Sequence, residues 1–205
     1  MARPATITAE GIIKAAVAFI DQWGSDAFTL RALGIELGVH HTALFRYFPT
    51  KEDLIQSIFE YVIADTRTEL KDVPDVPLER VRAVALALRS VLHQHPGLIM
   101  AIAATTGSPS SLDTQRAIIA DLRTLGVPEE QLAVRYQALE SYIIGSTLFD
   151  FTGAPIHLEQ RQERYESLGD PTFLAALDSV EAVDQHNEAA FTFGLDCLLA
   201  GITKP

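Results

Sequence analysis

A short run of polar, small and basic side chains, framed by apolar ones, could make contacts with DNA. The positions that could face outward are His41, Thr42, Ala43, Arg46 and Tyr47. The apolar residues around them, which we expect to face inward, are Val39, Leu44 and Phe48. A helix that enters the major groove needs an outer face of this kind, because base edges are read by polar and basic side chains. The spacing therefore predicts a recognition helix.

The residues before this run predict a second short helix that would position it. Thr29 is a good N-cap for a helix from Leu30 to Leu37, and Gly38 stands where a left-handed residue closes a helix. Two short helices joined at a glycine are the helix-turn-helix pattern. Thr50 and the acidic residues after it resemble a capping box that starts a longer helix.

The rest of the chain also shows helical periodicity, and no segment alternates as a strand would. Further helices are predicted over Thr8–Trp23, Leu78–His95, Leu112–Leu125, Pro128–Phe151 and Val183–Ile202, with a short surface helix between Gly153 and Pro171. A short apolar segment, Leu98–Ala104, follows the break at Pro96 and Gly97. The sequence predicts an all-α fold of about nine helices. We expect a DNA-binding domain over residues 1–50 and a sensing and dimerisation domain over residues 51–205.

The charge of the chain restricts where DNA could bind. The 205 residues carry a net charge of −11, which alone argues against nucleic acid. Residues 1–51 hold five basic and four acidic side chains, whereas residues 52–205 hold 11 basic and 23 acidic ones. Because phosphates repel the acidic part, any DNA contact should lie within the first 51 residues.

The composition is typical of a protein of the reducing cytoplasm. Cys197 is the single cysteine, which excludes an internal disulfide, and we expect it to be a small buried residue of the last helix. No apolar run approaches the roughly 18 residues of a membrane span. No phosphate loop, nucleophile elbow or zinc-protease motif is present, so an enzyme is not expected. We expect no metal and no cofactor.

The helix-turn-helix segment resembles the tetracycline-repressor (TetR) family of bacterial regulators. That family's pattern is Thr-x-Arg-x-Leu-Ala-x-x-Leu-Gly-Val, then Leu-Tyr-x-His-Phe, then Lys-x-x-Leu. The residues at the corresponding positions here are Thr29, Arg31, Leu33, Leu37, Gly38, Val39, Leu44, Phe45, Arg46, Tyr47, Phe48, Lys51 and Leu54. The resemblance covers residues 8–62, and the last helix, from Phe191 to Gly201, is also similar to that of many members.

The resemblance implies a role for each matching polar residue. Contacts with backbone phosphates are implied for Thr29, Arg31, Tyr47 and Lys51. Contacts with base edges are implied for His41, Thr42 and Arg46, the last suited to guanine or a nearby phosphate. For Thr29, Tyr47 and Lys51, a plain capping or surface role is the alternative.

Two residues depart from the family pattern. Phe45 stands where a tyrosine hydroxyl usually bonds a phosphate, and it has no donor. Two orientations are open for its ring: outward, against the sugar-phosphate chain, or inward, in the core of the domain. His40 stands where a serine often caps the recognition helix, and it is a poorer cap.

The resemblance also implies a homodimeric repressor that reads an inverted repeat and leaves it when a small molecule binds. The dimer is expected to form through the helix Leu132–Phe151 and the last helix, which combine small residues with large ones. A small, largely apolar effector is expected among the helices of residues 78–152. The residues proposed for that pocket are Met100, Tyr142 and Phe149, which could instead be plain core. A helical adaptor that binds only protein is a further alternative, against which the helix-turn-helix argues.

Overall fold

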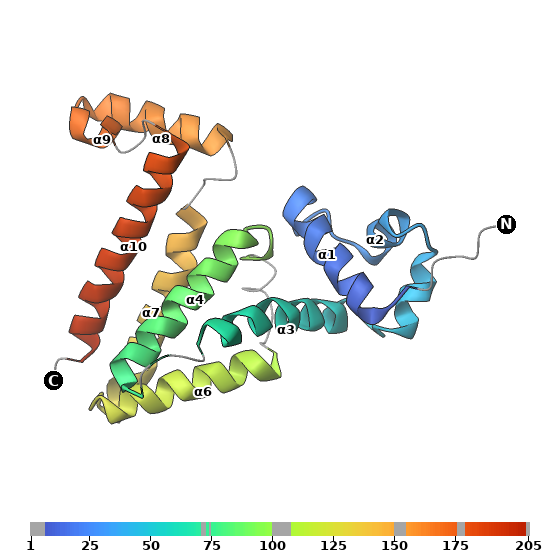
Figure 1. Cartoon of the computed structure of the whole chain (residues 1–205), viewed down its shortest axis with the longest axis horizontal. Helices are drawn as coiled ribbons and strands as arrows, with labels where there is room; N and C mark the ends of the chain where they lie inside the picture. Colours follow the sequence, from blue (N-terminus) through green and yellow to red (C-terminus); the bar gives the residue numbers. More distant parts are fainter. Residues whose placement is uncertain are drawn as a thin grey trace. The chain divides into compact units, whose positions relative to one another are not determined.

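The computed structural model describes residues 7–70, 73, 75–99, 108–149, 155–175 and 179–203. Within these ranges the chain forms ten helical elements and no strand, which confirms the predicted all-α fold (Figure 1). The elements are α1 (Ala9–Trp23), α2 (Leu30–Glu36), η1 (His41–Arg46), α3 (Lys51–Glu69), α4 (Pro77–Gln94), α6 (Pro109–Thr124), α7 (Glu129–Phe149), α8 (Pro155–Leu168), α9 (Pro171–Ala175) and α10 (Val180–Ile202).

The chain divides into two compact units. The first comprises Met1–Val73 and Leu86–Ala117, and the second comprises Pro74–Ala85 and Ile118–Pro205. Both α4 and α6 contribute one part to each unit. The first unit thus contains α3 together with the helices before it, and the functional boundary at residue 50 stays a prediction.

The predicted caps start the helices of the first unit. Thr8 accepts a hydrogen bond from the Gly11 amide at 3.0 Å, and Thr29 accepts one from the Ala32 amide at the same distance. Thr50 and Asp53 form the predicted capping box, because the amide of each bonds the side chain of the other. These bonds satisfy amides that a helix leaves without partners in its first turn.

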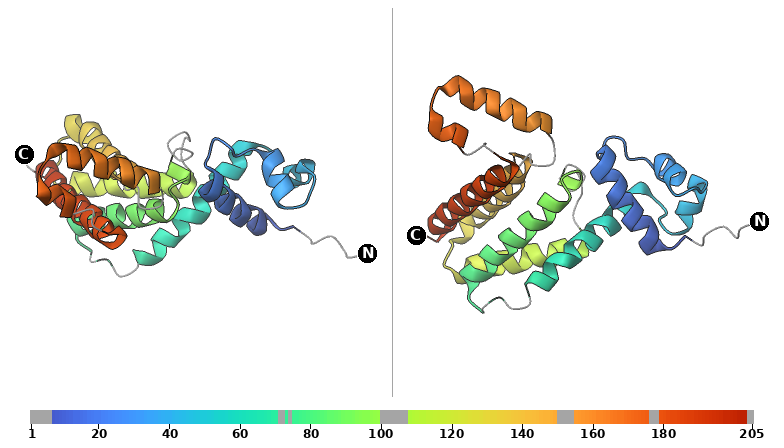
Figure 2. Two further views of the ribbon diagram at one scale, coloured as in Figure 1. Left: turned by 90° about the horizontal axis from the view of Figure 1, so that it is seen from above. Right: turned by 45° about the horizontal axis from the view of Figure 1, so that its top comes forward.

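One hydrophobic core fixes the helices of the first unit. In Figure 2, α1 lies beside both α2 and α3, and its apolar stripe packs on theirs. The fully buried members of this core are Ile12, Ala16, Leu33, Leu44 and Leu54. Phe28, only 2% exposed, fills the corner between α1 and α2. This core holds α1, α2 and α3 of the first unit in fixed positions.

The second unit is organised by the close packing of α7 on α10 (Figure 2). The Tyr142 ring stacks on Phe191 with centroids 5.4 Å apart, and a Cβ atom on Gly194 would lie 2.1 Å from the Tyr142 hydroxyl. A larger residue at position 194 would require the Tyr142 side chain to move. Phe191 and Gly194 therefore take part in packing within one chain.

The remainder of the second unit differs from prediction in detail. The expected short surface helix is a 14-residue helix, α8, which packs with α9 through the rings of Tyr165 and Phe173. Arg80 pairs with the buried carboxylate of Asp121. This pairing raises the pKa of Arg80 further above its ordinary value.

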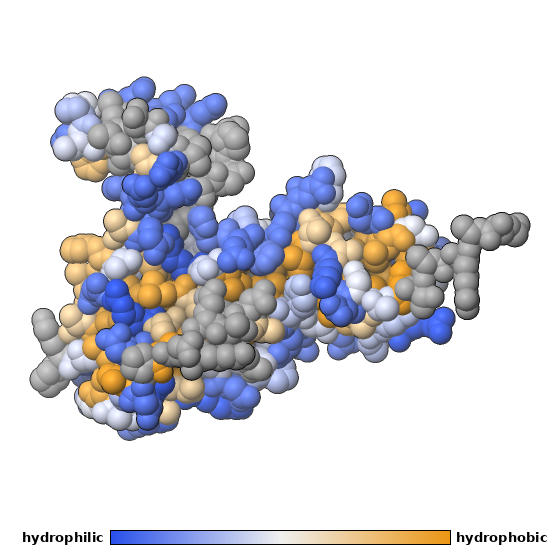
Figure 3. All heavy atoms as spheres, viewed as in Figure 1, coloured by the Kyte–Doolittle hydropathy of each residue, from blue (hydrophilic) through white to orange (hydrophobic). Residues whose placement is uncertain are grey.

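Apolar side chains reach the surface in both units (Figure 3). Phe193 on α10 is 73% exposed, and Cys197, one turn further along, is exposed as well. The expectation of a buried Cys197 is therefore wrong, because it lies on the face of α10 opposite Leu195 and Leu199. Among the helices described, none is both long and apolar enough to cross a bilayer.

Candidate DNA interface

A tight turn brings η1 directly against α2. Gly38, with φ of +65°, closes α2 as predicted, and the Val39 amide bonds the Gly34 carbonyl at 2.9 Å. A Cβ atom on Gly34 would lie 3.0 Å from the Val39 carbonyl oxygen and 3.1 Å from the backbone of His41. The glycine at position 34 thus lets the start of η1 lie on α2.

The recognition element is a 3₁₀ helix of six residues, His41–Arg46. The sequence predicts a helix here but does not distinguish the tighter form. Leu44 is fully buried and Phe48 is 6% exposed, so both anchor the element in the core of the first unit, as predicted. The opposite side of η1 is thereby turned to solvent.

The outward side of η1 carries the predicted polar and basic residues. Thr42, Arg46 and Tyr47 are exposed, and His41 is half-buried. Phe45 is 44% exposed, so the alternative that its ring is turned into the core is wrong. Arg31, at the start of α2, is exposed too. The structure therefore brings these predicted residues to the surface of the first unit.

Lys51, the first residue of α3, contacts Phe28, which lies between α1 and α2. Its Nζ donates to the Phe28 carbonyl oxygen at 2.8 Å and lies 5.4 Å from the centre of the Phe28 ring. The ammonium group has three hydrogens, so two remain for other acceptors. Lys51 can consequently hold this corner together and still bind a phosphate.

The hydroxyl of Tyr47 is already used. It donates its single hydrogen to the Ile7 carbonyl oxygen at 2.6 Å and so fastens the segment before α1. A phosphate could replace that carbonyl only by breaking the bond, because a tyrosine hydroxyl has one hydrogen to donate. Its implied phosphate contact stays a prediction, and the alternative structural role is present in the structure. The Thr29 hydroxyl serves as the N-cap of α2 and keeps its own hydrogen.

His40 contacts both the side chain and the backbone amide of Thr42. It serves as the N-cap of η1, since its Nδ1 lies 2.8 Å from the Thr42 hydroxyl and 3.4 Å from the Thr42 amide. Its ring lies against that of His41, with centroids 4.4 Å apart and planes tilted by 38°, and His41 meets the Phe45 ring edge-on at 6.3 Å. Three rings thus form a continuous row along η1.

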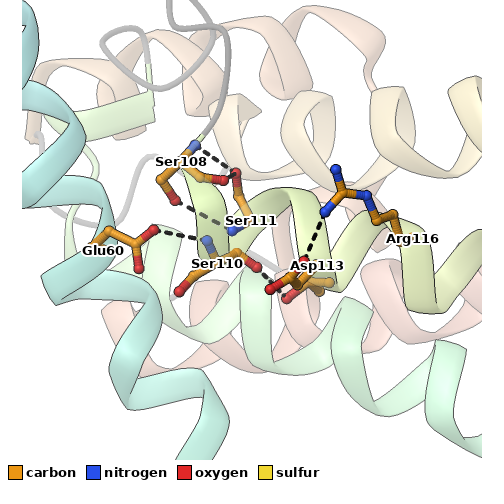
Figure 4. Close-up of polar contacts among 7 residues, drawn as sticks. Glu60, Ser108, Ser110, Ser111, Asp113 and Arg116 are labelled. Carbon is orange, nitrogen blue, oxygen red and sulfur yellow. Dashed lines mark hydrogen bonds and ion pairs between the residues drawn. The ribbon is translucent and has the colours of Figure 1, made fainter.

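A second polar cluster in the first unit joins α3 to the start of α6 (Figure 4). Glu60 accepts a hydrogen bond from the Ser110 amide at 2.8 Å. Ser108 and Ser111 bond each other's amides and close the first turn of α6. A carboxylate at this end of a helix is favoured by the helix dipole. An open groove of about 780 Å³ runs from Tyr47 along α3 to this cluster.

The residues proposed for an effector pocket are only partly described. Met100 and the side chain of Phe149 lie outside the described residues. The Tyr142 hydroxyl donates to the Phe191 carbonyl oxygen at 2.9 Å and is half-buried. In the described part of the chain, no cluster of three His, Cys, Asp or Glu could hold a metal ion.

The fold and this surface define a helix-turn-helix regulator. Residues 12–58 match the family model of bacterial regulatory proteins of the tetR family, and residues 75–205 match the tetracyclin repressor-like C-terminal domain. The chain belongs to the TetR family of transcriptional regulators, as the resemblance implied.

Individual relatives agree with this assignment. An uncharacterised HTH-type transcriptional regulator of Mycobacterium tuberculosis is 32% identical over 170 residues, which cover 75% of this chain and 74% of the relative. A possible TetR family regulator from Streptomyces coelicolor A3(2) has a similar structure, with a TM-score of 0.75, 25% identity and coverage of 95% and 98%. A tetracycline-repressor variant of Acinetobacter baumannii, solved with minocycline, has a TM-score of 0.67, 24% identity and coverage of 96% of each chain.

Proposed function

We propose that this regulator is a homodimeric repressor that binds an inverted repeat through η1 and is released by a small molecule. The observation that carries the DNA-binding role is the two-sided construction of η1. Leu44 is fully buried in the core, while Thr42, Arg46 and Phe45 are turned to solvent. Such an element can enter a groove without losing its scaffold. The protein would act in the cytoplasm, by binding rather than by catalysis.

The two phosphate-binding cations of this proposal flank η1. Arg31 lies in the first turn of α2 and is exposed, and Lys51 begins α3 with two ammonium hydrogens free of the Phe28 bond. Phosphate contacts fix the orientation of a protein on DNA, whereas contacts with base edges give specificity. Arg31 and Lys51 would therefore orient the domain, and Arg46, Thr42 and His41 would read the sequence.

The proposed dimer follows from the small size of one recognition element and from the exposed face of α10. A single module buries too little surface for high specificity, so two copies are needed. Phe193 and Cys197 are exposed on one face of α10, beside the exposed alanines Ala189, Ala190 and Ala200. Small side chains around one aromatic ring suit close packing of α10 on α10 of a second copy, with the symmetry of an inverted repeat.

The proposed effector would act on DNA binding through α6. The bond from the Ser110 amide to Glu60 ties the first turn of α6 to α3, and α3 follows η1 after four residues. A ligand that displaces this turn would bias the position of α3 and with it the spacing of the two recognition elements. The Acinetobacter baumannii variant, solved in complex with minocycline, is one example of a protein of this fold with a bound small molecule. Met100, Tyr142 and Phe149 stay the proposed lining.

Binding to genomic DNA fragments tests the proposed function. The wild-type protein should retain a small set of fragments that share an inverted repeat, with two protomers for each repeat. Replacing Arg46 with Ala should weaken this specific binding more than binding to random DNA, because a base contact is lost. Uniform binding to all fragments, or none at low salt, would refute the proposal.

A further inference from the structure

The hydrogen-bond partners of His40 favour the tautomer with its hydrogen on Nε2. The Thr42 amide points at Nδ1 of His40 from 3.4 Å, and an amide can only donate. The Thr42 hydroxyl lies 2.8 Å from the same nitrogen. Nδ1 therefore offers its lone pair, and the hydrogen of the neutral ring is on Nε2.

The Nε2–H group of His40 points away from Thr42. Nδ1 and Nε2 lie on opposite edges of the imidazole ring, so Nε2 points away from Thr42 when Nδ1 faces it. His40 is exposed, and no hydrogen bond to its Nε2 is found among the described residues. His40 thus holds a donor in a fixed direction at the surface, because its cap bonds prevent the ring from turning.

This donor lies on the same surface as the outward residues of η1. The ring of His40 lies tilted against His41, and His41 meets Phe45, so the three rings run along the side of η1 that carries Thr42. Phe45, at the far end of this row, has no group that can donate. Most hydrogen bonds at such surfaces go to the phosphates and sugars that border the groove.

We propose that His40 is a DNA-contact residue whose Nε2–H donates to a backbone phosphate of the operator. This inference rests on the proposed function, since it assumes that η1 binds in the groove. The contact is made by a neutral ring, because Nδ1 stays an acceptor for Thr42. It therefore adds a hydrogen bond without adding a cation, and it carries no direct sequence information.

Two substitutions separate the phosphate contact from the cap. His40→Asn keeps an oxygen near the place of Nδ1, and asparagine is a good N-cap, but the donor at Nε2 is lost. His40→Gln carries an amide that reaches the place of Nε2 and can donate, but it loses the acceptor for Thr42. Affinity for operator and for random DNA is measured at several salt concentrations, together with the melting temperature.

His40→Asn should bind both kinds of DNA about three- to tenfold more weakly, the range expected for one exposed hydrogen bond to a charged group. Its melting temperature and the salt dependence of its binding should equal those of the wild type, because no counterion is released by a neutral donor. His40→Gln should melt lower and bind more tightly than His40→Asn.

Three results would overturn the inference. These are an affinity of His40→Asn within twofold of the wild type, a loss of affinity that follows a lower melting temperature, and a flatter salt dependence, which would indicate a charged ring. Failure of the wild type itself to select any DNA would refute the proposed function as well, so the two failures are distinguishable.

Discussion

A Cβ atom placed on Gly97 would lie 2.3 Å from the carbonyl oxygen of Ile20. Gly97 follows α4, and Ile20 lies in the last turn of α1, so two segments of the first unit meet backbone to backbone. His95 reinforces the same junction, since its Nδ1 lies 2.7 Å from a carboxylate oxygen of Asp21. The helix-turn-helix is thus supported by a segment 74 residues further along the chain.

Replacing Gly97 with Ala should destabilise the protein. The added methyl group meets backbone atoms of Ile20 that cannot turn aside as a side chain can. Overpacking of this kind costs about 1–3 kcal/mol, or more where the backbone must move. The melting temperature should fall by roughly 2–4 °C for each kcal/mol in a chain of this length.

Gly145→Ala is the matched control for this substitution. Gly145 lies within α7, and nothing lies within 4 Å of its added Cβ. Its stability should be unchanged or raised by up to about 1 kcal/mol, because alanine favours a helix more than glycine does. Equal melting temperatures for the two variants would contradict the close approach of Gly97 and Ile20.

Replacing Lys51 with Ala should weaken binding to every DNA sequence alike. The substitution removes the proposed phosphate contact and the hydrogen bond to the Phe28 carbonyl oxygen. The slope of log affinity against log salt should fall by about one phosphate. Lys14→Ala is the control, because Lys14 lies on α1 in an exposed pair with Glu10. An unchanged salt slope for Lys51→Ala would leave the lysine with a structural role only.

The local parts of this structure could be predicted from the sequence. A cap is decided by residues three positions apart, so the roles of Thr8, Thr29 and the pair of Thr50 with Asp53 follow from type and spacing. The buried side of the recognition helix, with Leu44, follows from the same periodicity. These features need no knowledge of the rest of the chain.

Contacts between distant residues could not be predicted. The hydrogen of the Tyr47 hydroxyl goes to Ile7, 40 residues away, and nothing in the pattern around Tyr47 indicates it. Likewise, the residue type of Cys197 favours burial, but Cys197 is exposed because of the face of α10 on which it lies. His40 caps η1 with a long bond of 3.4 Å to the Thr42 amide, as a poorer cap residue should, and its closer contact with the Thr42 hydroxyl does not follow from general cap preferences.

Replacing Phe193 with Asp should convert the dimer into monomers. A carboxylate at the centre of the proposed α10 interface would be desolvated without a partner, which is strongly unfavourable. Sedimentation equilibrium should show a dimer for the wild type and a monomer for the variant. Cys197, on the same face of α10, should react slowly with a thiol reagent in the wild type and quickly in the variant.

Ile35→Asp provides the control for that substitution. Ile35 is 75% exposed on α2, so the same charge is introduced at an apolar residue outside α10. This variant should stay dimeric and keep its Cys197 protected. A dimeric Phe193→Asp variant would show that the subunits meet elsewhere.

Replacing Phe45 with Tyr should strengthen binding to DNA. The ring is 44% exposed on the outward side of η1, so its para position can carry a hydroxyl into solvent and toward a phosphate. Hydrogen bonds to charged groups contribute roughly 1.5–3 kcal/mol, and the hydrated setting favours the low end. Affinity should rise by several-fold to about tenfold, since ~1.4 kcal/mol is a factor of ten.

The gain from Phe45→Tyr should appear on operator and random DNA alike, because a phosphate contact carries no direct sequence information. The melting temperature should not change, since the new hydroxyl is solvated in the free protein. The control combines Phe45→Tyr with His40→Asn. His40→Asn removes the Nε2–H donor to a phosphate, and the tyrosine hydroxyl adds a different donor on the same surface. The double variant should recover the affinity lost in His40→Asn. An unchanged affinity for Phe45→Tyr on both DNA types would mean that position 45 does not approach a phosphate in the complex.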